Sequence, residues 1–122
     1  MHTIIGGVMP KKSRTKGKSG ELEVVNLLRV KWPDVCRNLD QYQKTSGRDL
    51  NNTQPWCIQI KRQRRVTDGD RNTAYVEASS AIDHQYERPV VVHRSDKGKW
   101  KAFWRLDNMM VETYLSDWLE VS

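Results

Sequence analysis

Three polar residues in the middle of the chain, Asp49, Gln59 and Lys61, are of types that can carry out chemistry together. A carboxylate such as Asp49 offers the hard oxygen that Mg²⁺ prefers, and carbonyl oxygens of the Gln59 side chain and the Ile60 backbone can supply further ligands. A lysine beside such an ion can orient an attacking water or offset negative charge on a phosphorane-like transition state. These residue types indicate a metal-dependent phosphodiesterase site that uses Mg²⁺, with Mn²⁺ as a substitute.

A β-hairpin is the element expected to bring these residues together. The alternation of apolar and polar side chains over residues 56–61 is typical of a strand, and the turn-forming residues before it predict a hairpin with a second strand over 47–50. Such a hairpin places Asp49 opposite Gln59, on the face that also carries Lys61. The pattern alone has a simpler explanation, because strands often expose alternating polar residues.

A helix is predicted over residues 21–31, where apolar side chains recur at helical spacing. Ser19 or Gly20 is the expected N-cap, and Pro33 ends the segment. Glu21 falls near the centre of the apolar face, so we expect it to point inward. A carboxylate in the first turn also complements the helix dipole, which gives Glu21 a structural explanation as well as a functional one.

The remaining elements complete an α/β pattern. A loose strand candidate covers residues 35–43, and a helix is predicted over 75–86. Two strands over 89–93 and 100–106 follow, and an amphipathic helix over 110–119 closes the chain. The order αβββαββα predicts an α/β fold with a mixed central sheet flanked by helices.

Basic residues lie on both sides of the candidate site. Residues 1–18 are expected to form a flexible basic arm, and residues 19–122 a single domain. Such cations bind phosphates without reading bases, which favours recognition of DNA shape over sequence. A solubilising tail and a solvated charge cluster are the alternative explanations. The candidate DNA-binding residues are Lys11, Lys12, Arg14, Lys16, Lys18, Arg48, Arg62, Arg64 and Arg65.

Composition favours an anionic partner. The 122 residues carry 21 Lys and Arg against 15 Asp and Glu, a formal net charge of +6, so nucleic acid is the first candidate. No apolar stretch approaches the ~18 residues of a membrane span, and the two cysteines match neither a disulfide framework nor a metal-binding pattern. We expect an intracellular, cytoplasmic protein that binds DNA and no membrane.

The motifs resemble those of a known nuclease superfamily. Residues 16–28, 46–50 and 58–61 are similar to the three motifs of the PD-(D/E)XK nucleases. Within that superfamily the chain most resembles archaeal-type Holliday-junction resolvases and small phage-borne nucleases related to them. The resemblance covers residues 16–106 and implies a restriction-endonuclease-like fold.

The resemblance also implies a role for each matching residue. Glu21 corresponds to the helix acid that completes the metal site, Asp49 to the central metal ligand, and Lys61 to the motif lysine. It implies Mg²⁺-dependent hydrolysis of DNA that leaves 5′-phosphate ends. It further implies a homodimer that acts on branched DNA, such as a four-way junction formed in DNA recombination.

Gln59 departs from the family pattern, which usually has Asp or Glu at this position. A neutral amide removes one negative charge from the metal site, which should weaken Mg²⁺ binding or favour Mn²⁺. Two alternatives therefore stay open. One is a DNA-binding or assembly protein that keeps the nuclease fold without efficient catalysis, and the other is a nuclease without junction preference.

Overall fold

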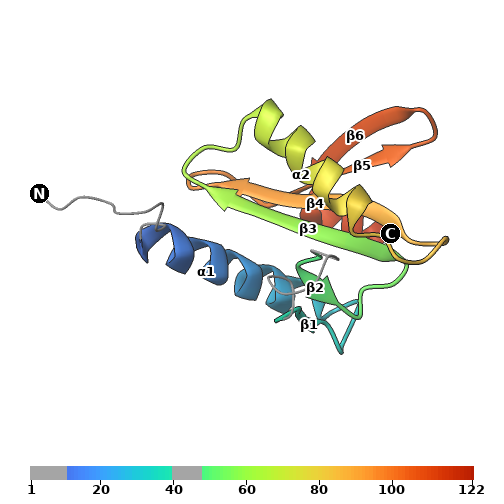
Figure 1. Ribbon diagram of the computed structural model, residues 1–122, viewed down its shortest axis with the longest axis horizontal. Helices are drawn as coiled ribbons and strands as arrows, with labels where there is room; N and C mark the ends of the chain where they lie inside the picture. Colours follow the sequence, from blue (N-terminus) through green and yellow to red (C-terminus); the bar gives the residue numbers. More distant parts are fainter. Residues whose placement is uncertain (1–10, 40–47) are drawn as a thin grey trace, which may run out of the picture.

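A mixed β-sheet lies between helices on its two faces (Figure 1). The computed structural model describes residues 11–39 and 48–122, and for residues 11–17 the backbone alone. The α/β class with a mixed sheet flanked by helices is confirmed. In chain order the elements are α1 (Lys11–Leu28), β1 (Cys36–Arg37), β2 (Leu50–Asn51), β3 (Trp56–Gln63), α2 (Asp68–Ser80), β4 (Arg88–Ser95), β5 (Lys101–Leu106), β6 (Met109–Tyr114) and α3 (Leu115–Val121).

The main sheet has the strand order β3-β4-β5-β6, so β3 lies at one of its edges. β3 and β4 are parallel, and α2 forms the crossover that a parallel pair requires. β4 pairs with β5, and β5 with β6, in antiparallel fashion. The candidate site lies at the outer edge of β3, which pairs with no other strand in residues 11–39 and 48–122.

The two faces of the sheet bury different side chains. Val90 and Val92 pack with α1 and α3, whereas Val91, between them, packs with Ala74 of α2 and with Phe103. This alternation follows from the two-residue period of a strand. The face of α1 and α3 holds the larger core, which is centred on the fully buried Trp118.

α1 approaches β3 closely at Gly20. A Cβ atom built at Gly20 would lie 3.0 Å from the Cβ of Arg62, so the absence of a side chain lets the two elements meet. The helix begins at Lys11, and the predicted start at Ser19 or Gly20 is wrong. Residues 11–18 are helical rather than irregular, because extending an existing helix costs little and five of these eight residues are Lys or Arg, which are good helix formers. Residues 1–10 of the predicted arm lie outside the described residues.

The predicted hairpin between residues 47–50 and 56–61 is wrong. β2 pairs instead with β1, with Leu50 opposite Arg37. The reason is a tight turn, in which the Trp56 N–H donates to the Thr53 carbonyl at 2.9 Å and the Thr53 hydroxyl donates to the Trp56 carbonyl at 2.8 Å. This turn redirects the chain between β2 and β3. Of the strand predicted over 35–43, Cys36–Arg37 is observed, and residues 40–43 lie outside the described part.

α2 and the C-terminal elements also differ from expectation. α2 begins at Asp68 because Thr67 and Asp70 form a capping box, and it ends at Ser80, before the predicted end at residue 86. Residues 109–114 form β6 rather than the start of a helix. Asp107, with φ 53°, makes the tight connection between β5 and β6. The order is therefore αβββαβββα.

Among the described helices, none is both long and apolar enough to cross a membrane.

Candidate active site

Asp49 lies beside the free edge of β3. Its Oδ2 atom accepts a hydrogen bond of 2.7 Å from the backbone N–H of Ile60, and the residue is only 5% exposed. The N–H and C=O of one strand residue project to the same edge, so the Ile60 carbonyl faces this side of β3 as well. The structure therefore brings the predicted acid and the predicted backbone ligand together, although Asp49 meets Ile60 rather than Gln59.

Arg48 anchors the chain directly before Asp49. Its guanidinium donates to both carboxylate oxygens of Glu87, at 2.6 and 2.8 Å, and to the Ala81 carbonyl and the Asp83 carboxylate, each at 3.0 Å. The hydrogen bonds from Arg48 lower the pKa of Glu87 to about 2. These contacts and the 14% exposure of its side chain give Arg48 a structural role, and its predicted contact with DNA stays a prediction.

The ionised form of Asp49 is disfavoured. Burial raises the pKa of Asp49 to about 7, and the negative charges of Glu21 and Glu77 raise it as well. The hydrogen bond from Ile60 and the positive charge of Lys61 act in the opposite direction. A carboxyl group with a perturbed pKa and several charged neighbours is typical of a functional site, and a bound cation would relieve the repulsion among the acids.

Glu21 reaches this site from α1 and is buried, as predicted. Its Oε1 atom accepts a hydrogen bond of 2.8 Å from Nε of Arg37 in β1. Sequence reasoning missed Arg37, because its position depends on the pairing of β1 with β2, which no local sequence pattern predicts. The ion pair holds Glu21 in position and balances its charge.

Gln59 lies on the face of β3 that α2 covers, and it is buried. Its Nε2 atom donates to Oε2 of Glu77 in α2, at 3.2 Å. Within the described part of the chain, the buried Oε1 atom of Gln59 has no hydrogen-bond partner. Sequence reasoning missed Glu77. The capping signal of Thr67 and Asp70 could have placed the start of α2 correctly, and with it the helix face that carries Glu77.

Lys61 follows on the same face of β3 and is partly exposed. No side-chain hydrogen bond or ion pair joins its ammonium group to the residues that the structure describes. Its positive charge nevertheless acts on Asp49. Lys61 is therefore available to a group from outside the protein, beside the Asp49 carboxylate.

The oxygen donors around Asp49 are of the type that a divalent cation takes. Asp49 and Glu21 supply buried carboxylates, and the unpartnered Oε1 of Gln59 and the Ile60 carbonyl are neutral oxygens. In residues 11–39 and 48–122, no group of three or more His, Cys, Asp or Glu side chains is close enough to hold an ion. The ligand set predicted from the sequence does not contain three such side chains. It combines two carboxylates with a side-chain amide oxygen and a backbone carbonyl.

The predicted DNA-binding residues fall into separate groups. Arg62 is largely covered, with its Nη2 atom 3.9 Å from Oδ1 of Asp96. Lys18 is exposed on α1, and Arg64 and Arg65 are exposed just beyond the end of β3. The other candidates have side chains that lie outside the described part of the structure: Lys11, Lys12, Arg14 and Lys16.

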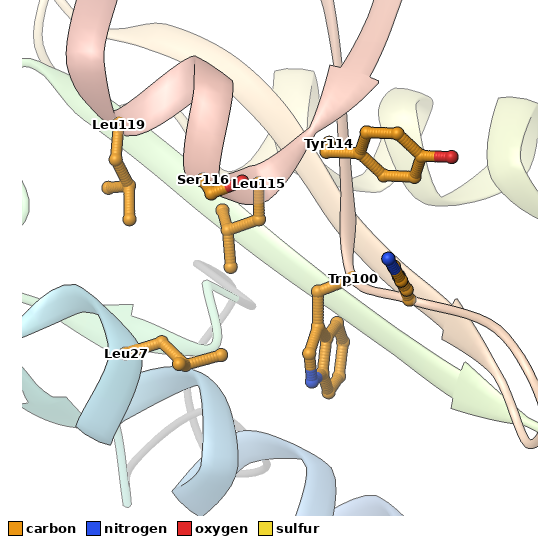
Figure 2. A pocket seen from close by; sticks show the side chains of 7 residues that line it. Leu27, Trp100, Tyr114, Leu115, Ser116 and Leu119 are labelled. Atoms are coloured by element: carbon orange, nitrogen blue, oxygen red, sulfur yellow. The ribbon is translucent and has the colours of Figure 1, made fainter.

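An apolar pocket lies elsewhere, between α1 and α3 (Figure 2). Its volume is about 280 Å³, and Leu27, Trp100 and Leu115 are among the residues that line it. It contains no acidic residue and none of the candidate site residues. Its chemistry is that of a packing surface rather than of a hydrolytic centre.

Comparison of the chain with protein-family models, with curated proteins and with solved structures found no match. The functional assignment therefore rests on the residues and on their arrangement.

Proposed function

We propose that this protein is a metal-dependent DNA endonuclease of the PD-(D/E)XK type, with a restriction-endonuclease-like fold. One observation carries the proposal. The Asp49 carboxylate is buried at the free edge of β3 and bonded to Ile60, with Glu21 and Lys61 near enough for their charges to act on it. An acid, a backbone carbonyl and a lysine at one strand edge are the parts that hydrolysis of a phosphodiester needs.

Each residue then has a distinct task. Asp49, Glu21, the Gln59 Oε1 atom and the Ile60 carbonyl would hold the ion. When bound, Mg²⁺ or Mn²⁺ supplies Lewis-acid activation of water and of the phosphate. The Ile60 N–H fixes the orientation of Asp49. The Lys61 ammonium orients the attacking water and offsets the negative charge that develops on the phosphate oxygens.

The charge distribution supports a DNA substrate. Arg64 and Arg65 are exposed directly after the strand that carries Gln59 and Lys61, where they can contact phosphates beside the scissile bond. Contacts of this kind recognise the shape of the backbone. Branched DNA such as a four-way junction, cut by a homodimer, is the substrate class that we propose.

A second candidate function is DNA binding or assembly without efficient catalysis. One observation favours it: Gln59, at a position where the family pattern has an acid, donates its amide to Glu77 at 3.2 Å. A site that lacks one strand carboxylate binds Mg²⁺ more weakly.

A gel cleavage assay separates these functions. It compares a synthetic four-way junction with linear duplex DNA, in Mg²⁺ and in Mn²⁺, for the native protein, Asp49→Ala and Gln59→Glu. Symmetric nicks near the branch point that vanish in Asp49→Ala are expected, with activity kept or raised in Gln59→Glu. Equal cutting of both substrates would refute the junction preference, and DNA binding without cutting by the native protein and Gln59→Glu would favour the second function.

A further inference from the structure

The turn between β4 and β5 carries positive charge that the proposed mechanism does not use. Lys97 and Lys99 are both exposed in this turn. We propose that the turn is a second DNA-contact element, whose two lysines bind backbone phosphates. They would act next to Arg64 and Arg65, which follow β3. The inference rests on the proposed function and deepens it, because it gives the DNA a path beyond the candidate site.

Hydrogen bonds fix this turn beside the end of β3. The Val66 N–H donates to the Ser95 hydroxyl at 2.9 Å, and the Asp96 N–H donates to the Arg64 carbonyl at 3.3 Å. The turn itself is closed by a hydrogen bond of 3.0 Å from the Gly98 N–H to the Ser95 carbonyl. Its two lysines therefore lie at the same end of the sheet as the two arginines that follow β3 (Figure 1).

The acids near the turn already face arginines of the strands. Glu23 of α1 accepts a hydrogen bond of 2.6 Å from Arg94, and Oδ1 of Asp96 lies 3.9 Å from Nη2 of Arg62. In the part of the chain that the structure describes, no ion pair involves the four outer cations, which are Arg64, Arg65, Lys97 and Lys99. The inner arginines thus have counter-charges that these outer cations lack among the described residues.

This distribution of charge favours an anionic polymer as the partner. Exposed cations held close together repel one another, and a bound chain of phosphates removes that repulsion. Lys and Arg side chains presented in this way bind a nucleic-acid backbone without reading its bases. At the opposite end of the sheet, by contrast, Arg48 is paired with Glu87 and Asp83.

α1 adds positive charge to the same end. Gly20 lies against Arg62, since a Cβ atom built at Gly20 would be 3.0 Å from the Cβ of Arg62. Lys18, two residues earlier in the helix, is exposed, and the helix continues from there to Lys11 (Figure 1). A DNA backbone that passes the end of β3 near Lys61 would therefore meet cations from three segments: α1, the residues after β3, and the β4–β5 turn.

The salt dependence of DNA binding tests the proposal. Fluorescence anisotropy of a labelled four-way junction and of a labelled duplex, in EDTA so that neither is cut, gives the affinity of the full chain between about 50 and 300 mM salt. Lys97→Ala combined with Lys99→Ala should weaken binding by about tenfold. It should also lower the slope of log affinity against log salt by about 1.8, since each lost phosphate contact contributes about 0.9.

A charge-matched control separates contact from net charge. Arg29→Ala combined with Lys31→Ala removes two cations just after the other end of α1 and should leave the slope unchanged. Circular dichroism checks the folding of each variant. An equal fall of the slope in this control would attribute the effect to net charge and refute the contact.

A second measurement locates the contacts on the DNA. Junctions with single methylphosphonate substitutions lack the charge of one phosphate each. The native protein should lose affinity where it contacts the missing charge, and the double lysine variant should no longer respond at some of these positions. If the variant responds at every position as the native protein does, the turn is not a contact, although the proposed function stands. If the native protein binds neither DNA, both proposals fail.

Discussion

The carboxylate of Asp49 accepts a hydrogen bond of 2.7 Å from the backbone N–H of Ile60. This side-chain contact joins the start of β2 to the edge of β3, two segments that belong to different sheets. It places an acid at the edge of β3 where, within the described residues, no strand pairs with its backbone. Burial disfavours the ionised form of this carboxyl group. We therefore expect Asp49 to destabilise the metal-free fold while it supports activity.

Asp49→Asn should stabilise the metal-free protein at pH 8. Asparagine keeps an oxygen that can accept from Ile60 but carries no charge. The folded-state pKa of Asp49 is raised from 3.8 to about 7, so the native protein loses stability relative to the variant as pH rises through this interval. We expect a difference of about 4 kcal/mol above pH 7, since the pKa rises by about three units and each unit corresponds to about 1.4 kcal/mol.

Urea denaturation in EDTA, from pH 4 to pH 8, measures this difference in the free energy of unfolding. Asp117→Asn, at an exposed position of α3, is the matched control and should show no comparable dependence on pH. An Asp49→Asn protein that is less stable than the native protein at pH 8 would contradict the expected penalty of burying the charge.

Lys61→Ala should abolish cleavage while leaving the fold intact. The ammonium has no partner to lose among the described residues, and removing one group that stabilises transition-state charge reduces the rate by about a hundredfold or more. DNA binding should change by less than about threefold, because one phosphate contact contributes modestly. Single-turnover cleavage and a binding titration, with Arg29→Ala as the exposed control, measure both. A loss of binding as large as the loss of cleavage would refute the catalytic role.

Arg64→Ala combined with Arg65→Ala should weaken DNA binding through electrostatics. Both side chains are exposed just after β3, so the substitutions remove charge without removing packing. The slope of log affinity against log salt should fall by about 0.9 for each phosphate that the protein no longer neutralises. Fluorescence anisotropy from 50 to about 300 mM salt gives the slope. An unchanged slope would show that DNA does not pass over this end of β3.

Glu87→Gln should destabilise the protein. Its carboxylate binds Arg48 through two hydrogen bonds, and the two side chains are only 4% and 14% exposed. Breaking this pair leaves the covered guanidinium with only the exposed Asp83 as a charged partner, which we expect to lower the free energy of unfolding by about 2–4 kcal/mol. Arg48→Lys should not preserve stability, since a lysine cannot make the paired contact.

The pKa of Glu87 also makes this contribution pH-dependent. The hydrogen bonds from Arg48 lower the pKa of Glu87 from 4.5 to about 2, so the stabilisation is present above pH 4.5 and is lost as pH falls toward 2. Thermal melts of the native protein and Glu87→Gln should therefore converge in acid. Equal melting temperatures at pH 7 would contradict the anchoring role of Arg48.

Local patterns predicted the elements that carry most of the candidate site. The helical period identified the buried face of α1, including Glu21, and the alternation in β3 separated Ile58 from Gln59. Both signals work because the period of a regular element alone decides which side chains face inward. Glu21 and Lys61 could therefore be identified before their contacts were known, whereas Arg37 and Glu77 could not.

Contacts between elements could not be predicted in the same way. The pairing of β1 with β2, which brings Arg37 to Glu21, depends on short strands without a periodic signal. Glu77 meets Gln59 only because α2 packs across β3. The helix wrongly predicted over 110–119 shows a further limit. The apolar residues of β6 and α3 happen to follow a helical spacing, but the turn at Asp107 brings residues 109–114 back alongside β5 as a strand, and the helix begins only at Leu115.

The central claim is that Asp49 supports metal-dependent hydrolysis of DNA. The most direct measurement is single-turnover cleavage of an end-labelled four-way junction by the native protein and by Asp49→Asn, in Mg²⁺, in Mn²⁺ and in EDTA. We expect nicks with 5′-phosphate ends from the native protein with metal, and none in EDTA or from the folded variant. Tight binding of the junction without product in either metal, or equal cleavage by Asp49→Asn, would contradict the proposal.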